Sequence, residues 1–367
     1  MNIEKDLKKD GITVIKPVDT LNITIIAKFV ADKLCSAFPL YNLNYDNLYI
    51  KISNTPMYIA KIPDGMSEAN YFYKNSSIYF KEGLNIEEMK TFAVHEFIHR
   101  FQEKKDSKNI LYRLGLCDFT GLKVRGMALN EGSVQYMTAK ALKSNFETVK
   151  YYGIELNSNS ANCYPLLCSL VRQMAYITGE QVLFDSTLYS NDNFKKCFIG
   201  LCGQVNFYKI QDNLDKILNT EEELSKVILI SQNNISENKN IKFANKITKL
   251  KNIITTTYIE TQNLILTSYF NKQFNLIYSN ADFENYRKKL YNFKDYIGIV
   301  ENDSFFNNYY INKMNELSNK SDYINNNIYL KEYKNDFFHI LLRKISTTIS
   351  TARKLYARSS ENVWDKY

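Results

Sequence analysis

Two of the three histidines in this 367-residue sequence lie four positions apart, in the segment His95-Glu96-Phe97-Ile98-His99. In an α-helix, side chains at positions i and i+4 lie on the same face, so two imidazoles with this spacing can bind one metal ion. An H-E-x-x-H pattern on a helix is typical of zinc sites whose glutamate acts as a general base. We therefore predict that His95 and His99 bind zinc and that Glu96 removes a proton from a water molecule.

The neighbouring sequence predicts that this motif lies on a helix from about residue 86 to residue 104. Asn85 can cap the first turn and Glu88 can reach back to it, in a variant of the capping box. Apolar residues recur along two adjacent faces, which indicates a helix buried on most sides; they are Ile86, Met89, Ala93 and Phe97 on one face and Val94, Ile98 and Phe101 on the next. The alternative is a packed core histidine or a chance match, but two buried imidazoles beside a carboxylate are costly without a ligand.

A catalytic zinc site takes a third protein ligand and leaves a fourth position for water. A histidine at metzincin spacing is absent, because Gln102 and Lys105 stand where that pattern needs glycine and histidine. We select Glu131, which follows His99 by 32 residues within the segment LNEGSVQY (129–136). Asn130 can cap a following helix at 131–145, and Gly132 leaves room for a second helix to approach. The alternative is an ordinary first-turn glutamate, which the helix dipole favours.

The segments HEFIHRFQ (95–102) and ALNEGSVQY (128–136) resemble the gluzincin branch of zinc metallopeptidases, the broad group that includes thermolysin. The resemblance covers roughly residues 70–145 and implies that His95, His99 and Glu131 are the ligands and that Glu96 is the general base. In thermolysin-like members, an aspartate four residues after the ligand glutamate orients a ligand histidine. Here that residue is Gln135, whose amide oxygen can still accept the imidazole N–H. The interval of 32 residues is also longer than in thermolysin-like enzymes.

Peptide hydrolysis would further need a donor for the developing oxyanion and a surface for the substrate. Tyr136 is one candidate donor and His339 another, although His339 lies in the apolar segment FFHIL (337–341), which also suits a packed or surface histidine. In the zincin arrangement that the resemblance implies, a peptide or protein substrate adds as a strand to a sheet edge. Residues 70–74 or 77–82 could supply that edge, or either could be an interior strand.

The elements that must position these residues indicate an α+β fold. A helix is predicted at 19–38, followed by strands at 48–53, 57–62, 70–74 and 77–82, the last two forming a hairpin across Asn75-Ser76. All five prolines lie at or before Pro165, and a stretch from 204 to 297 has neither proline nor glycine, which predicts consecutive helices. The later predicted helices are 162–178, 204–218, 241–270, 301–318 and 335–356.

We divide the chain into a small zincin-like sheet-plus-helix core at 1–156, which carries the HEFIH and NEG motifs, and a larger, mostly helical part at 157–367. The short polar gap at 157–160 favours packing of the second part against the first. We expect that part to shape one side of the cleft, with the apolar helix at 335–356 closing the core. An independent partner-binding bundle on a tether is the alternative.

Composition excludes several classes of protein. The chain is 45% hydrophobic and 23% charged, which is ordinary for a globular protein, and no apolar run approaches the roughly 20 residues of a membrane span. Six cysteines are too few for a disulfide scaffold, and the start lacks the apolar segment of a signal peptide. The net charge of +8 is spread along the chain without a nucleic-acid-binding motif. We therefore expect a soluble protein that is cytoplasmic or released without a classical signal peptide, and no nucleic-acid partner.

These features lead to one main hypothesis and two alternatives. The main hypothesis is a zinc metallopeptidase, more consistent with an endopeptidase than an exopeptidase. One alternative is a regulatory or toxin-like protease whose helical part selects a single protein target. The other is a non-catalytic helical interaction protein with a structural zinc site. Glu96 distinguishes this last alternative from the others, because a structural site needs no base beside His95.

Overall fold

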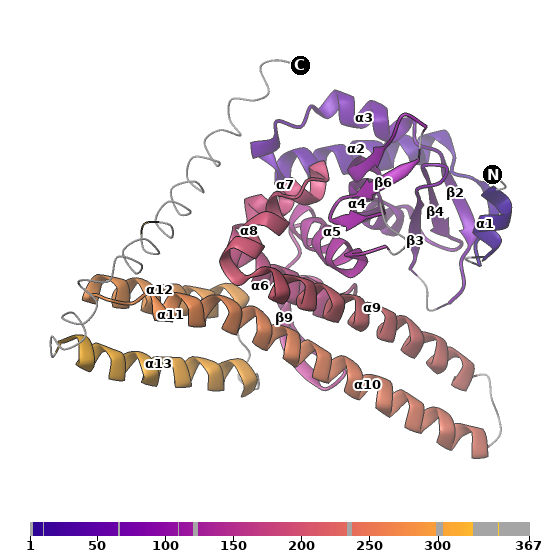
Figure 1. Ribbon diagram of the computed structural model, residues 1–367. Helices are drawn as coiled ribbons and strands as arrows, with labels where there is room; N and C mark the ends of the chain where they lie inside the picture. The colour runs from indigo at the N-terminus through magenta and orange to yellow at the C-terminus, as the bar shows by residue number, and fades with distance from the viewer. Residues whose placement is uncertain are drawn as a thin grey trace.

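The structure is a computed structural model that describes residues 3–9, 11–64, 67–108, 110–119, 124–232, 237–298, 304–325 and 344. Figure 1 shows an α+β fold in which small sheets and helices come first and a larger, mostly helical part follows. Within the described ranges, none of the helices combines the length and the apolar character needed to span a bilayer. Apart from residue 344, the predicted helix at 335–356, with His339, lies outside the described residues.

The first part of the chain builds a four-stranded sheet in the order β1-β2-β4-β3. Its strands are β1 (Thr13–Pro17), β2 (Met57–Lys61), β3 (Ala69–Phe72) and β4 (Ser77–Lys81). Strands β2 and β4 pair in parallel, while β3 pairs antiparallel with β4 through the predicted hairpin. Three of the four predicted strands are therefore confirmed, and β3 lies at one edge of the sheet.

The strand predicted at 48–53 is wrong, because residues Tyr45–Ser53 form helix α3. The side chain of Asn44 accepts the N–H of Asn47 and caps the first turn. Helix α3 packs against helix α2 (Thr20–Ala37), with Ile52 fully buried. The β-branched and aromatic residues of this segment fit a strand by local propensity, but the cap and the contact with α2 decide for a helix.

Helices α4 (Ile86–Gln102) and α5 (Met127–Ala141) pack against each other. The predicted capping box of α4 is confirmed, since Asn85 accepts the N–H groups of Glu87 and Glu88 while Glu88 accepts that of Asn85. The predicted cap of the next helix is wrong, because α5 begins at Met127 and Asn130 lies buried within it. Between the two helices run the short strands β5 (Glu103–Lys105), β6 (Leu111–Leu114) and β7 (Cys117–Asp118).

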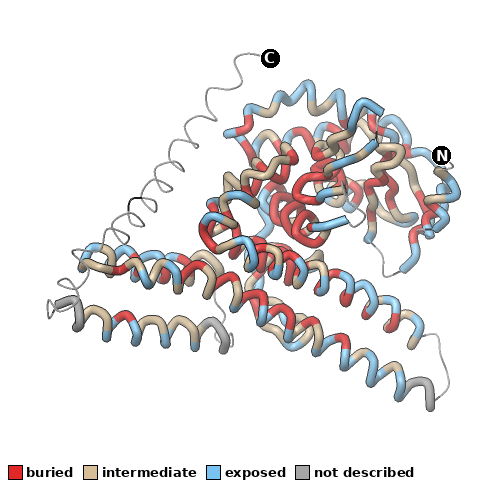
Figure 2. Tube along the Cα trace, in the orientation of Figure 1, coloured by how far each residue is buried: buried red, intermediate tan, exposed pale blue. Residues whose placement is uncertain are grey.

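The second part of the chain shares one apolar core with α4 and α5. The hairpin of β8 (Glu147–Tyr151) and β9 (Ile154–Ser158) leads into a series of helices: α6 (Pro165–Thr178), α7 (Glu180–Tyr189), α8 (Asn193–Cys202), α9 (Gln204–Gln232), α10 (Glu237–Leu266), a π-helical turn (Thr267–Asn271), α11 (Lys272–Asn275), α12 (Asn280–Ile297) and α13 (Ser304–Asn325). Buried residues are dense on α5 and α6 (Figure 2), and one hydrophobic cluster joins residues of α2, α4, α5, α6 and α9. Helices α9 and α10 run side by side, and their far ends extend away from the body (Figure 1).

We expect Glu221→Gln to stabilise the protein above pH 5. Glu221 on α9 is buried, its Oε1 has no hydrogen-bond partner among the described residues, and burial raises the pKa of its carboxyl to about 8. The folded chain thus keeps a proton that the unfolded chain releases above its ordinary pKa of 4.5, so stability falls as the pH rises from about 4.5 to 8. Since one pKa unit corresponds to about 1.4 kcal/mol, removing this proton release should add on the order of 4 kcal/mol at pH 8.

Thermal melts at several pH values check this expectation. The melting temperature of the Glu221→Gln variant should match the parent at pH 4.5 and exceed it by several degrees at pH 8. Glu222→Gln makes the same change at the neighbouring exposed position and should leave the melting temperature unchanged at both pH values. A pH-independent difference for Glu221→Gln would show that its carboxyl is not protonated in the folded protein.

Candidate metal centre

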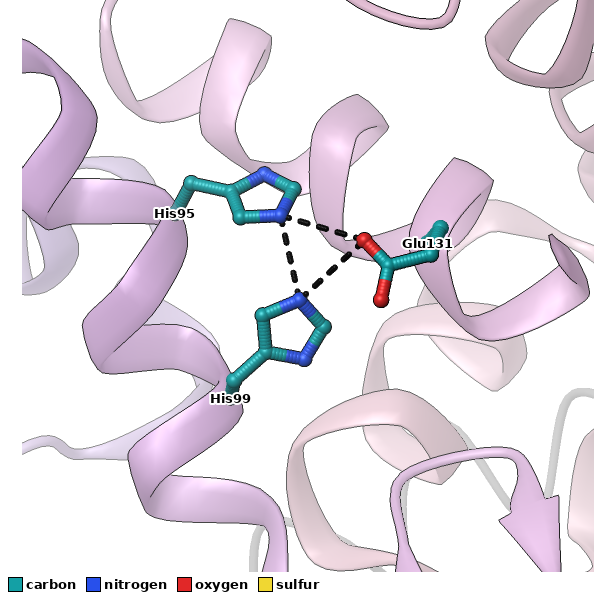
Figure 3. Close-up of side chains that lie close together, drawn as sticks. All are labelled: His95, His99 and Glu131. Carbon is teal, nitrogen blue, oxygen red and sulfur yellow. Dashed lines mark hydrogen bonds and ion pairs between the residues drawn. The ribbon is translucent and has the colours of Figure 1, made fainter. Parts of the chain in front are cut away.

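Helices α4 and α5 bring His95, His99 and Glu131 to one point (Figure 3). The Nε2 atoms of the two imidazoles lie 3.0 Å apart. Glu131 Oε2 lies 3.3 Å from Nε2 of His95 and 3.4 Å from Nε2 of His99. The side chains of His95, His99 and Glu131 keep 13%, 7% and 18% of their surface exposed, so the cluster is largely buried but reaches solvent. The structure thus brings together all three side chains that the sequence predicted as ligands.

The spacing of these three atoms fits a tetrahedral metal ion. Bonds of about 2.0–2.1 Å at the tetrahedral angle separate neighbouring ligand atoms by about 3.3 Å. The three observed distances, 3.0, 3.3 and 3.4 Å, lie close to this value. Two imidazoles and a carboxylate can therefore hold a metal ion without rearrangement, and they supply three of its four ligand positions.

Gln135 fixes the orientation of His95. The Nδ1–H of His95 donates to Gln135 Oε1 at 2.9 Å, and Gln135 Nε2 donates to Ser160 Oγ at 2.8 Å. Ser160 Oγ in turn donates to the carbonyl oxygen of Cys163, so it can only accept from Gln135. The amide oxygen must then face His95, which places the proton on Nδ1 and leaves the Nε2 lone pair for a metal.

A second carboxamide, Gln102, orients His99 in the same way. His99 Nδ1 lies 3.2 Å from Gln102 Oε1, which also accepts from Asn130 Nδ2 at 3.2 Å. Asn130 Oδ1 accepts the backbone N–H of Leu116, and this bond fixes the direction of both amides. A side chain at Gly115, where φ is +57°, would overlap Asn130 and Gln102. Sequence reasoning missed Gln102 and Asn130, although one lies a helical turn after His99 and the other directly before Glu131.

The charges of the cluster favour a cation at its centre. Burial opposes ionisation of Glu131, yet His99 and His95 hold the pKa of its carboxyl well below the ordinary value. Burial likewise opposes protonation of His99, but Glu131 and then Glu96 raise its pKa to about 9. The metal-free cluster therefore retains a proton as its positive charge, and a metal cation would take the place of that proton.

Glu96 lies between this cluster and the edge of the sheet. Its side chain is buried, and its Oε2 accepts the backbone N–H of Tyr71 at 2.7 Å. The backbone N–H of Lys81 on β4 donates to the carbonyl oxygen of Glu68. Residue pairs that exchange backbone hydrogen bonds alternate along two antiparallel strands with pairs that do not. The N–H and C=O groups of Tyr71 therefore face away from β4, toward the open edge of β3. Burial raises the pKa of the Glu96 carboxyl, against the opposing effect of His95 and His99.

The structure does not bring Tyr136 to the metal cluster. Its hydroxyl makes hydrogen bonds with Glu180 of α7 and with the hydroxyl of Tyr296 of α12, the latter at 2.8 Å. Glu180 also accepts from Tyr296 at 2.8 Å and pairs with Lys140 at 2.8 Å. Tyr136 thus links α5 to α7 and α12. Its hydroxyl binds Glu180 and Tyr296, so the structure does not support the predicted role of Tyr136 as the oxyanion donor.

Comparison with protein-family models, with curated proteins and with solved structures gave no match. His95, His99 and Glu131 form a group that can hold a metal ion.

Proposed function

We propose that the protein is a zinc-dependent metallopeptidase that cuts within polypeptide chains. The observation that carries this proposal is the convergence of His95, His99 and Glu131 at tetrahedral spacing, with the buried carboxylate of Glu96 beside them. Two imidazoles, one carboxylate and an open fourth position are typical of catalytic zinc sites. A structural zinc site is closed by four protein ligands and needs no base, which disfavours the non-catalytic alternative.

The roles of the side chains follow from their contacts. Zinc bound at this cluster would polarise the scissile carbonyl and acidify a water molecule. Glu96 takes the proton of that water and passes it to the leaving amine. Tyr71 N–H holds Oε2 of Glu96, while Oε1 makes no hydrogen bond within the described part of the chain and is the oxygen that takes the proton.

The edge strand β3 supports a substrate that is an extended peptide. Of the two segments predicted as an edge, 70–74 overlaps the edge strand β3, and 77–82 overlaps β4, which lies inside the sheet. The backbone of Tyr71 faces outward from β3 and contacts Glu96, so a peptide that adds to this strand would pass the general base. Strand addition binds the main chain regardless of where the substrate begins or ends, which favours cleavage within a chain.

Zinc analysis of the purified chain, together with cleavage of a peptide library, tests this function. We expect about one zinc per chain after washing with a chelator and cuts at internal peptide bonds. A chain that binds zinc but leaves every peptide and unfolded protein intact would favour the non-catalytic alternative, whereas a chain without zinc affinity would contradict the proposal as a whole.

We expect the zinc affinity to depend on which group at position 135 accepts the hydrogen bond from the Nδ1–H of His95. Gln135→Ala removes the acceptor and should weaken zinc binding about 10–100-fold. Gln135→Glu supplies a charged acceptor, makes the imidazole more basic and should tighten binding. Competition with a chromogenic chelator measures both changes. Gln204→Glu adds the same charge at an exposed position and should have no effect, and parental affinity in Gln135→Ala would contradict the role of this hydrogen bond.

A further inference from the structure

The loop between β9 and α6 is fixed against α5, beside His95. Gln135, which orients His95, donates to Ser160 Oγ at 2.8 Å, and Ser160 Oγ donates to the carbonyl oxygen of Cys163. The N–H of Ser160 donates to Ser158 Oγ at 3.0 Å, and both serines are buried. The polar segment 157–160, which was expected to separate two parts of the chain, therefore packs against α5 beside the metal centre.

Tyr164 follows this loop and lies next to the part of α5 that carries Glu131. Helix α6 begins directly after it, and α6 crosses α5 so closely that a Cβ on Gly132 would lie 2.9 Å from Val171 and 3.1 Å from the carbonyl oxygen of Leu167. Leu167 thus meets α5 at Gly132, and Ser160 meets it at Gln135. Tyr164 lies between these two contacts along the chain, one turn before Leu167.

The backbone at Tyr164 has a left-handed conformation. Its φ of 48° and ψ of 46° lie in the left-handed region, which is uncommon for an aromatic residue. Proline at 165 disfavours the right-handed helical conformation for the preceding residue, and the anchored Ser160–Cys163 segment fixes the approach of the chain. Such conformations cost on the order of 1–3 kcal/mol and persist where the surrounding structure imposes them.

The hydroxyl of Tyr164 remains available to a substrate. No described residue makes a hydrogen bond with it, and the ring is only partly buried against the core. Burial is the main reason that its pKa lies well above the ordinary value, and the carboxylates of Glu131 and Glu96 raise it further. These effects agree with the place of Tyr164 between the Gln135–Ser160 and Gly132–Leu167 contacts, and at neutral pH its hydroxyl carries its proton.

We propose that Tyr164 is the hydrogen-bond donor for the carbonyl oxygen of the substrate as negative charge develops on it. This inference rests on the proposed peptidase function and gives Tyr164 the role first considered for Tyr136 and His339. The hydroxyl keeps its proton throughout, so no bond is broken at Tyr164. A donor held in place by the fold stabilises the charged transition state more than the neutral substrate.

Steady-state kinetics of Tyr164→Phe in the full chain test the inference. We expect kcat to fall about 10²–10³-fold, while KM, zinc content and melting temperature stay near parental values. A loss of zinc or of melting temperature would reveal a structural role instead and overturn the assignment. Tyr291→Phe, at an exposed position on α12, serves as the matched control and should leave kcat unchanged.

Two further outcomes separate this inference from the function on which it rests. Full kcat in Tyr164→Phe, with an active parent, would overturn the role of Tyr164 alone. A fall in kcat for Tyr136→Phe but not for Tyr164→Phe would return the role to Tyr136. A parent chain that binds zinc but cleaves nothing would remove the proposed function and the inference with it.

Discussion

Glu96→Gln should lower turnover about 10²–10⁴-fold while zinc remains bound. Glutamine has the size and helix propensity of glutamate, and its amide oxygen can still accept the N–H of Tyr71. It cannot take a proton from water, so the change removes the base and little else. Cleavage of a peptide found in the library gives kcat, and plasma emission spectroscopy gives the zinc content of the same samples.

The matched control for this change lies on the same helix. Glu87 is exposed in the first turn of α4, and Glu87→Gln removes the same charge without touching the metal cluster. We expect the control to keep both turnover and zinc. Near-normal turnover in Glu96→Gln would exclude Glu96 as the general base, even if the chain proved to be a zinc peptidase.

Local sequence signals were enough to place the first half of the site. The spacing of His95 and His99 and the capping box at Asn85 lie within one helix, so short-range rules predict both. The hairpin of β3 and β4 is equally local. The choice of Glu131 used only the neighbouring residues, and the structure brings its carboxylate to the two imidazoles.

The residues that sequence reasoning missed depend on contacts between distant parts of the chain. Asn130 looked like a helix cap because asparagine favours that position, but its amide binds the N–H of Leu116 and supports Gln102 instead. The position of Tyr164 depends on the hydrogen bond between Ser160 and Gln135 of α5. This contact joins residues 25 positions apart, with the β8–β9 hairpin between them. Neither periodicity nor composition reports which loop a helix will meet.

His95→Ala and His99→Ala should each abolish stoichiometric zinc binding after a chelator wash, and Glu131→Ala should weaken it strongly. Structural zinc sites bind with about 10–16 kcal/mol, so each of four ligands accounts for roughly 3–4 kcal/mol, or about 10²–10³-fold in affinity. Removing one histidine also leaves the other imidazole beside Glu131 without the second nitrogen that completes the tetrahedral spacing. Zinc content and chelator competition measure the losses.

The zinc dependence of the melting temperature separates a lost ligand from a damaged fold. Zinc that binds the folded chain raises the melting temperature of the parent, and this increase should vanish in the histidine variants when each is compared with its own metal-free form. Glu147→Ala, at an exposed position on β8, should keep the full increase. If Glu131→Ala also kept it, with parental affinity, the third ligand would have to be sought elsewhere. The two imidazoles would then still define the centre, because their Nε2 atoms converge through Gln135 and Gln102 independently of Glu131.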